Sequence, residues 1–395
     1  MKFSFISLVV IFFISQIIFA GEKDLDSLVN NAVNISLNHL ENSVKEIGDS
    51  ELYSSYGTKD LRWKLVKRDD WTSGFYAGCL WYAYEFSSNP EFERWARKWT
   101  ESLEEEKLNQ YTHDLGFKFM CSYGNGFRLG KIENKNKYKD VLLTAAKTLS
   151  ERYDSSVGCL SSNWDVATIK NSYPVIIDIM MNLELLLWAS ENGGPSYYID
   201  YSRDHAIKTY HDFVRPDGST YHIVRYNKNT GEIINKGTIQ GSGDETTWAR
   251  GHAWGTYGMV VLYRYTKDKQ FLYDAVHLAN YFLKNLPEDH ISPWDFQSDI
   301  KYKDVSATAI VTSALFELIN YVDNDSLKEY YKWEAKAMLT SLCKEPYFLG
   351  NKKTNCLLDH AVQNLPANSN IDVPSIFADY YFLEALIRYK TLEEK

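Results

Sequence analysis

A single aspartate in apolar surroundings is the sharpest chemical signal in this sequence. Asp178 stands between Ile177 and Ile179, and because Pro174 suits the first turn of a helix, we place Asp178 beyond the capping positions. A carboxyl group among apolar side chains loses its hydration, so its pKa rises and it keeps a proton near neutral pH, as a general acid must. The alternative is a structural carboxyl that bonds to nearby backbone or to Asn182.

A second carboxyl, that of Asp114, follows His113 at the start of another apolar segment. At this position an aspartate is equally plausible as a helix N-cap, and that alternative stays open. If the two segments begin on the same side of the protein, His113 and Asp114 face the same opening as Asp178. The charge of Asp114 would then hinder ionisation of Asp178, and its oxygens could orient a water molecule.

Several other residues could bind a sugar. Arg250 and Trp254 are four positions apart and so share one helix face, which suits a sugar carboxylate and a sugar ring. The alternative is an arginine stacked on a structural tryptophan. Trp71 precedes a Thr-Ser-Gly turn and could be a stacking platform, while His222 and Gln240 could bind hydroxyl groups at the rim.

Six segments share one pattern, in which a short polar cluster leads into an apolar helix of about four turns. The clusters contain, in order, Asp70, Asp114, Asp178, Arg250, Asp304 and Asp379. Between them lie charged, amphipathic stretches such as residues 91–106, 138–153, 198–213, 270–285 and 327–342. A helix that is apolar all round belongs inside and one with a charged face belongs outside. The pattern predicts an all-α fold, an (α/α)6 toroid of six helical hairpins.

In such a toroid the starts of the inner helices meet at one rim, so we expect the six polar clusters to line one funnel. The irregular spacing of the clusters argues against a solenoid. Residues 219–226 and 232–234, separated by Asn229-Thr230-Gly231, predict a β-hairpin at that rim.

Composition excludes several functions. The 395 residues carry a net charge of −9 and have no block of Lys and Arg, so a nucleic-acid partner is not expected. The sequence contains no His pair at metal-ligand spacing, no phosphate-binding loop and no Gly-x-Ser-x-Gly turn. We therefore predict neither a metal nor another cofactor. The 29 Tyr, 19 Phe and 11 Trp suit a protein that lays flat rings against sugars.

The N-terminus reads as a secretory signal. A lysine at position 2 precedes an apolar run over residues 3–19, which ends at Ala20-Gly21 before a polar stretch. A permanent membrane anchor is the weaker alternative because the unbroken apolar core is short. We predict a signal peptide over residues 1–20, a single domain over residues 21–395, and an exported, periplasmic protein without a stable membrane span after cleavage.

The five cysteines are odd in number, so at least one stays unpaired within a monomer.

Five motifs together resemble glycoside hydrolase family 88, the unsaturated glucuronyl hydrolases. They are Trp71-Thr72-Ser73-Gly74-Phe75, His113-Asp114-Leu115-Gly116-Phe117, Asp178-Ile179-Met180-Met181-Asn182-Leu183, Thr247-Trp248-Ala249-Arg250-Gly251, and Ala378-Asp379-Tyr380-Tyr381-Phe382. Several motifs in this order are more specific than any one of them, and the likeness covers essentially the whole mature chain.

The resemblance implies an (α/α)6 barrel that removes the terminal 4,5-unsaturated uronic acid from oligosaccharides left by polysaccharide lyases. Such an enzyme hydrates the enol-ether double bond. By match, Asp178 is the general acid and base and Asp114 is its partner carboxylate. The implied substrate-binding residues are Trp71, His113, His222, Gln240, Arg250, Trp254 and Ser369.

The chain departs from the family at three places. Tyr76-Ala77 replaces a common Trp-Pro, and His252 stands where glutamine is frequent, so we expect a different platform shape and rim polarity. The loop at residues 368–372 has no Lys or Arg, which puts tolerance of sulfated sugars in question. Alternative functions are an unsaturated rhamnogalacturonyl hydrolase of similar fold, an inverting glycosidase that uses the same two aspartates, and a non-catalytic sugar-binding protein.

Overall fold

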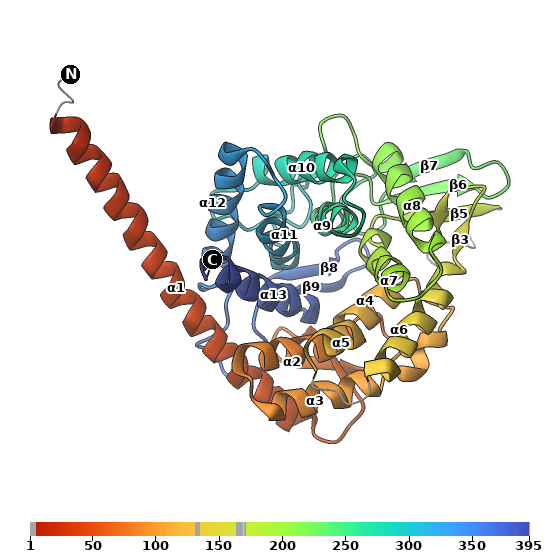
Figure 1. Ribbon diagram of the computed structural model, residues 1–395, viewed down its shortest axis with the longest axis horizontal. Helices are drawn as coiled ribbons and strands as arrows, with labels where there is room; N and C mark the ends of the chain where they lie inside the picture. The colour runs from red at the N-terminus through yellow and green to blue at the C-terminus, as the bar shows by residue number, and fades with distance from the viewer. Residues whose placement is uncertain (1–4, 131–134, 163–168, 170, 395) are drawn as a thin grey trace.

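The computed structural model describes the backbone of the chain except for residues 1–4, 131–134, 163–168, 170 and 395, and its side chains from residue 24 onward. In this part of the chain, six inner helical segments form a closed ring (Figure 1). They are α2 (Ser73–Ser87), α4 (Leu115–Phe119) with α5 (Asn125–Leu129), α7 (Ile179–Glu191), α9 (Ala249–Thr266), α11 (Val305–Leu318) and α13 (Ile376–Glu393). A π-helical turn, Met120–Gly124, joins α4 to α5.

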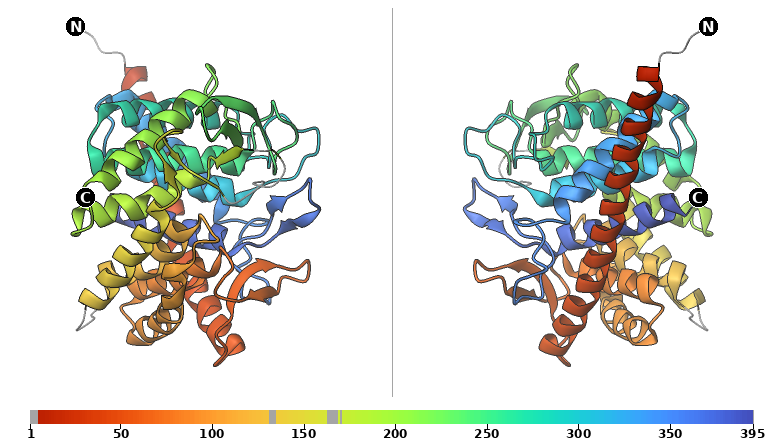
Figure 2. Two further views of the ribbon diagram at one scale, coloured as in Figure 1. Left: turned by 90° about the vertical axis from the view of Figure 1, so that its right-hand side faces the viewer. Right: turned by 90° about the vertical axis from the view of Figure 1, so that its left-hand side faces the viewer.

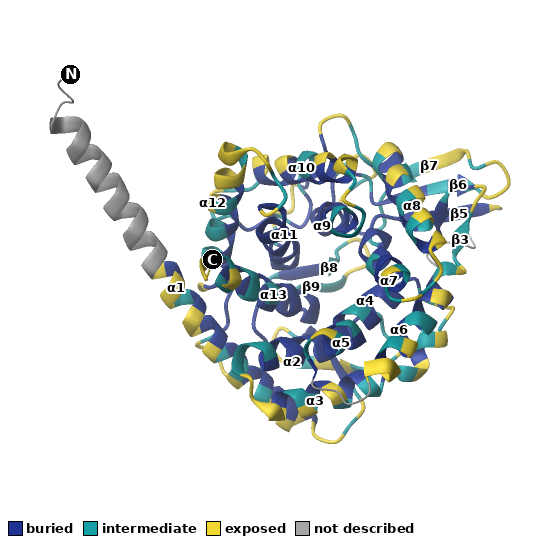
Figure 3. Cartoon of the chain, viewed as in Figure 1, coloured by how far each residue is buried: buried dark blue, intermediate teal, exposed yellow. Residues whose placement is uncertain are grey.

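The inner helices are apolar over most of their surface, and this places them inside the ring. All residues of α11 from Val305 to Leu318 are buried, and α13 packs against both α11 and α2 to close the ring. Figure 3 shows the inner helices as mostly buried, with more exposed positions on α5 and at the end of α13. The predicted all-α (α/α)6 fold is confirmed.

The outer helices each bury one stripe and expose the rest. They are α3 (Pro90–Glu101), α6 (Lys135–Ser150), α8 (Tyr197–Phe213), α10 (Lys269–Lys284), α12 (Asp325–Leu342) and the C-terminal half of α1 (Phe5–Ile47). In α3 the buried side chains include Phe92, Ala96 and Trp99, a spacing of four and three residues that gives a single helix face. Asn89 caps this helix by accepting a hydrogen bond from the backbone N–H of Glu91.

The sixth outer helix, α1, is one that the sequence pattern did not single out. Its buried side chains Leu25, Val29, Ala32, Leu40 and Val44 follow helical spacing, and the helix packs against α2, α12 and α13. The predicted boundary between residues 20 and 21 stays a prediction, and so does the single domain. None of the described helices is long and apolar enough to cross a membrane.

Short antiparallel sheets lie in the connections between the helices of the barrel. The two-stranded sheets are β1 (Tyr53–Gly57) with β2 (Trp63–Val66), β3 (Tyr153–Asp154) with β4 (Cys159–Leu160), and β8 (Ala361–Asn364) with β9 (Ser369–Val373). A fourth sheet has three strands in the order β5 (Ser172–Ile176), β6 (Ile223–Asn227) and β7 (Ile233–Gly237). Figure 2 shows the β1–β2 and β8–β9 hairpins next to each other at one end of the barrel.

The predicted hairpin exists as β6 and β7, although residues 219–222 lie outside it. The prediction that Pro174 begins a helix is wrong. Pro174 lies in β5, where it pairs with Arg225 on an edge strand, a position that tolerates a residue without an N–H group. The five cysteines are free and buried, and Cys79 and Cys121 lie in the core.

Candidate active site

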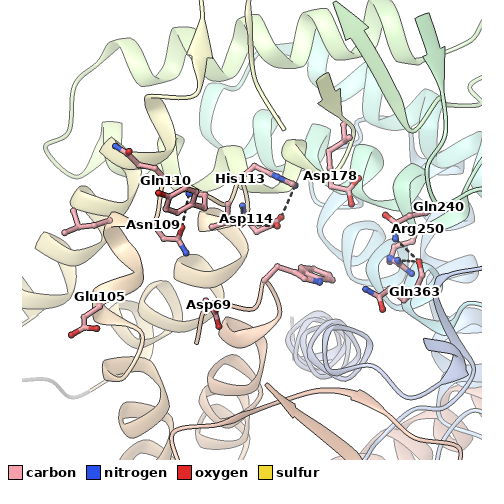
Figure 4. A pocket seen from close by; sticks show the side chains of 15 residues that line it. Asp69, Glu105, Asn109, Gln110, His113, Asp114, Asp178, Gln240, Arg250 and Gln363 are labelled. Atoms are coloured by element: carbon pink, nitrogen blue, oxygen red, sulfur yellow. Dashed lines mark hydrogen bonds and ion pairs between the residues drawn. The ribbon is translucent and has the colours of Figure 1, made fainter. Parts of the chain in front are cut away.

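A cavity of about 680 Å³ opens where several inner helices begin (Figure 4). Its lining residues come from four of the six polar clusters and from loops between them. They are Asp69, Trp71, Glu105, Leu108, Asn109, Gln110, Tyr111, Thr112, His113, Asp114, Ile176, Asp178, Gln240, Arg250 and Gln363. The prediction that all six clusters line one funnel is therefore only partly right.

The aspartates of the last two clusters have structural roles instead. The buried Asp304 caps α11 by accepting the N–H of Ser306 and pairs with Arg250. Asp379 accepts the backbone N–H groups of Leu357 and Leu358 and so anchors a loop. Burial raises the pKa of both carboxyl groups.

Asp178 occupies the junction between β5 and α7. It is the N-cap residue of α7 rather than an interior helix residue, but its side chain accepts no capping hydrogen bond. Its Oδ2 atom receives no hydrogen bond from the described residues and lies 3.6 Å from Nε2 of His222. Burial, the largest effect, and the charge of Asp114 raise the pKa of Asp178 to about 7, while Arg250 opposes the rise. The carboxyl group is therefore substantially protonated at neutral pH.

His222 faces Asp178 as a neutral ring with a defined tautomer. Burial and the charge of Arg250 lower its pKa to about 3. Its Nδ1 atom accepts the backbone N–H groups of Ile239, at 3.1 Å, and Gln240, at 3.3 Å. Because Nδ1 is the acceptor, the single ring proton resides on Nε2, which is the atom that faces Asp178.

The second carboxyl group is held by a small polar network. Asp114 is the N-cap residue of α4, as the alternative interpretation allowed, but it makes no side-chain capping bond. Thr112 Oγ1 donates to Asp114 Oδ2 at 3.3 Å, and His113 Nε2 lies 3.5 Å from Asp114 Oδ1. Asn182 Nδ2 approaches the same Oδ1 at 3.5 Å. Figure 4 shows His113, Asp114 and Asp178 directed into the same space.

Asn182 fixes the two inner helices that carry the aspartates. Its Oδ1 accepts the backbone N–H of Phe117 at 3.0 Å, and its Nδ2 donates weakly to the backbone carbonyl of Asp178 at 3.4 Å. It does not bond the Asp178 carboxyl group as the structural alternative proposed. The helices can approach this closely because residue 116 is glycine. A Cβ atom there would lie 2.3 Å from the Cα of Asn182.

Arg250 borders the cavity from within a buried network. Its guanidinium donates to Asp304 Oδ2 at 3.1 Å, to the carbonyl of Val362, and to that of Gln363 at 2.8 Å. Gln240 Nε2 donates to the same Gln363 carbonyl at 2.7 Å. Strand β8 thus holds both predicted binding residues against the cavity. Arg250 also stacks on Trp248, 4.6 Å from the ring centre, rather than on Trp254.

Of the three remaining residues predicted to bind substrate, only one borders the cavity. Trp71 lines the cavity and packs against Phe377 at a ring distance of 5.2 Å. Trp254 is fully buried against Phe117 and Tyr381 and does not border the cavity. Ser369, on β9, donates to Oε1 of the lining residue Gln363 at 3.2 Å. Direct contact of Trp254 or Ser369 with a substrate stays a prediction.

The expected effect of two sequence departures is wrong. Tyr76 is buried, stacks edge-on against Trp99 and accepts a hydrogen bond from Ser43. His252 is buried and bonds the carbonyl of Leu278. Neither residue borders the cavity, so neither shapes its platform or its rim.

Sequence reasoning missed one wall of the cavity. Leu108 and Tyr111 are 65% and 88% exposed at the mouth, which marks them as surface residues available for contact. They lie in and after the 3-10 helix Glu104–Leu108, a segment without helical or strand periodicity. Gln363 was also missed, because its position depends on the β8–β9 hairpin. Among the described residues, no group of three or more His, Cys, Asp or Glu could hold a metal ion.

A family model, Glycosyl Hydrolase Family 88, matches residues 43–382. The chain belongs to glycoside hydrolase family 88. An unsaturated glucuronyl hydrolase of Formosa agariphila is 40% identical over 334 residues, which cover 83% of this chain and 82% of the relative. An unsaturated chondroitin disaccharide hydrolase of Streptococcus agalactiae is 33% identical over 370 residues, or 91% of each chain.

The solved structures agree with this assignment. The crystal structure of an unsaturated glucuronyl hydrolase specific for heparin matches the family 88 enzyme with a TM-score of 0.88 and 34% identity, over 94% of this chain and 99% of that one. The resemblance predicted from the five motifs is therefore confirmed, and the protein is a glycoside hydrolase.

Proposed function

We propose that this family 88 enzyme removes a terminal 4,5-unsaturated uronic acid from acidic oligosaccharides by hydrating the double bond. The observation that carries the proposal is the buried Asp178 carboxyl group, whose pKa is raised to about 7, in the same cavity as Asp114. Protonating a carbon atom needs an acid that is still protonated at working pH. An aspartate in water, with a pKa near 4, is not protonated there.

The reaction begins with Asp178 as the acid. Its proton passes to carbon 4, the π electrons form the new C–H bond, and positive charge develops on carbon 5 and the ring oxygen. The ionised Asp178 then accepts a proton from the water that attacks carbon 5. The resulting hemiketal opens, and the second sugar is released. Asp178 thus gives one proton to carbon 4 and takes another from the water, so it ends the addition protonated as it began and no other acid is required.

The neighbouring residues support each stage. The Nε2 atom of His222, 3.6 Å from Oδ2 of Asp178, is close enough for its N–H group to stabilise the carboxylate that remains after proton transfer. Asp114, held by Thr112 and Asn182, orients the attacking water. Arg250 and Gln240 supply donors for the uronate carboxylate, and Trp71 and His113 contact the sugar ring. These roles follow from position and chemistry.

The decisive experiment measures the double bond itself. Hydration destroys the ultraviolet absorbance of the conjugated alkene, whereas direct glycosidic hydrolysis preserves it. With unsaturated disaccharides we expect absorbance to fall as free sugar appears, and Asp178→Asn to lose turnover by a factor of about 10³ while still binding substrate. Cleavage at constant absorbance would favour the inverting glycosidase instead. Near-normal turnover of the variant would remove Asp178 from the mechanism.

The proposal also concerns the identity of the second sugar, the one to which the unsaturated uronic acid is attached. Relatives named for chondroitin disaccharides and for heparin support a glycosaminoglycan-derived substrate. A panel of lyase products from glycosaminoglycans and from pectin separates this substrate from the unsaturated rhamnogalacturonide. Turnover confined to the pectin products would refute the assignment.

We also propose export through the secretory pathway to the periplasm, supported by the apolar run that ends at Ala20-Gly21. N-terminal sequencing of the protein recovered from the periplasmic fraction tests this directly. A first residue at or near Gly21 is expected, whereas an uncleaved cytoplasmic chain would contradict it.

A further inference from the structure

The β1–β2 hairpin is the most basic segment beside the cavity. Residues 59–68 contain five Lys or Arg and one Asp, in a chain whose net charge is −9. Lys59, Arg62, Lys64 and Lys67 are exposed. Among the described ion pairs, none involves Arg62, Lys64 or Lys67, whereas Lys59 reaches Asp372 at 3.1 Å. This is a local positive field on an otherwise acidic protein.

A groove of about 590 Å³ continues the basic surface. Arg62 and Trp63 line it together with Lys352 and Lys353 from a turn far away in the sequence. Two hydrogen bonds hold this turn to the hairpin: Thr354 Oγ1 donates to the Leu61 carbonyl at 2.6 Å, and Trp63 Nε1 donates to the Asn355 carbonyl at 3.2 Å. The groove also has one carboxylate, Glu46, whose Oε2 accepts from Asn355.

A chain of contacts connects this surface to the cavity. Lys64 Nζ donates to Asn370 Oδ1 at 2.7 Å, and Asn370 Nδ2 donates to Oε1 of Gln363, which lines the cavity. The backbone N–H of Gly57 donates to the Pro374 carbonyl at 2.7 Å, which keeps β1 beside the β8–β9 hairpin. Figure 2 shows the two hairpins adjacent in both views.

The wall of the cavity that continues from this hairpin carries two carboxylates. Asp69 and Glu105 line the wall formed by the 3-10 helix and the loop before α2. Arg68 pairs with Glu105 and so contributes less free charge than the other basic residues of the hairpin. An anionic group leaving the cavity is repelled by Asp69 and attracted toward Lys64.

We propose that the β1–β2 hairpin and Lys352-Lys353 form an anion-binding surface that holds the acidic remainder of a longer saccharide substrate. This rests on the proposed function for its biological meaning, because the saccharide enters the cavity with its unsaturated end. The shared chemistry of the ligand is a row of sulfate or carboxylate groups on a sugar backbone. Trp63 adds an aromatic edge to the groove. The loop at residues 368–372 lacks basic residues of its own, but the fold brings Lys59 and Lys64 to it.

The first test is binding without turnover. Saturated oligosaccharides, one series sulfated and one carrying carboxylates only, are titrated by calorimetry at several salt concentrations. The variant Arg62→Glu with Lys64→Glu is expected to bind about tenfold more weakly than the wild type and to show a smaller salt dependence. The matched control reverses two exposed lysines elsewhere on the surface, Lys284→Glu with Lys328→Glu, and keeps wild-type affinity.

The second test is turnover as a function of chain length. In the Arg62→Glu, Lys64→Glu variant, kcat/KM for an unsaturated disaccharide stays within about twofold of the wild type, while KM for a hexasaccharide rises about tenfold. The result that overturns the proposal is equal loss in the control variant, or no binding of either series by the wild type. Binding that survives without any turnover would refute the proposed function and leave the surface standing. The affinity of each series decides between sulfate and carboxylate.

Discussion

The raised pKa of Asp178 has a measurable cost in stability, and removing that cost is our first prediction. An aspartate with its ordinary pKa of 3.8 when unfolded and about 7 when folded holds its proton more tightly in the native state. Below pH 4 both states are protonated and the group costs nothing. Between pH 4 and 7 the unfolded state ionises first, so native stability falls as pH rises through this window.

The size of the effect follows from the shift. About three pKa units correspond to about 4 kcal/mol at pH 8, taken as an upper bound because the cavity admits water. Replacing Asp178 by Asn removes the ionisation and keeps the shape of the side chain. We therefore expect Asp178→Asn to have nearly wild-type stability at pH 4 and to exceed the wild type by roughly 1–4 kcal/mol at pH 8.

Urea unfolding of both proteins, followed by far-ultraviolet circular dichroism at pH values from 4 to 8, measures this difference. The control is Asp69→Asn, which replaces an exposed aspartate of the same cavity and has no burial penalty to relieve. A stability difference between wild type and Asp178→Asn that does not change with pH would refute the reasoning. It would mean that the carboxyl group is solvated in the native state.

The same titration governs activity. With Asp178 as the acid, kcat/KM measured as a function of pH should decline above about pH 7. If this decline kept its position in Asp178→Glu but shifted in a variant far from the cavity, Asp178 would not be the group that causes it. Gly116→Ala should lower stability by about 3 kcal/mol, because its Cβ would meet the backbone of Asn182 at 2.3 Å. Gly243→Ala, with its nearest contact at 3.7 Å, is the control, and equal losses in thermal unfolding would argue against this cause. Asn182→Ala should cost about 2 kcal/mol by leaving the Phe117 N–H unpaired and should reduce kcat more than it raises KM. An effect on KM alone would remove Asn182 from the positioning of the two aspartates.

The inner and outer helices could be predicted from the sequence because their signal is local. Helix α11 is apolar on all sides and α3 has one apolar stripe, and each pattern has only one stable place in a layered helical protein. The order of the polar clusters along the chain then placed Asp114, Asp178 and Arg250 at one opening. Helix α1 was not predicted as an outer helix because its apolar stripe follows the apolar run at the N-terminus without a clear break.

Other parts of the site depend on contacts between distant segments. Proline suits the first turn of a helix, and this local preference favours a helix start at Pro174, but β6 offers a strand partner that only the folded chain provides. Trp254 shares a helix face with Arg250, yet the ring closes around Phe117 and Tyr381 and buries the indole. Asp304 and Asp379 stand, like Asp114, in polar clusters before inner helices. Their contacts in the folded chain give them structural roles instead, because Asp304 caps α11 and Asp379 holds a loop.

The sequence by itself thus determined the family, the ring of helices and the two aspartates, because hydrophobic periodicity and short motifs are properties of neighbouring residues. Tertiary structure decided the chemical state of those aspartates. The pKa of Asp178 depends on the water excluded by β5, β6 and α7 and on the charges of Arg250 and Asp114. Which ring nitrogen of His222 carries the proton depends on a backbone turn seventeen residues away, where the N–H of Ile239 donates to Nδ1. Such effects fall off with distance in space, not along the chain, so only the folded structure could assign them.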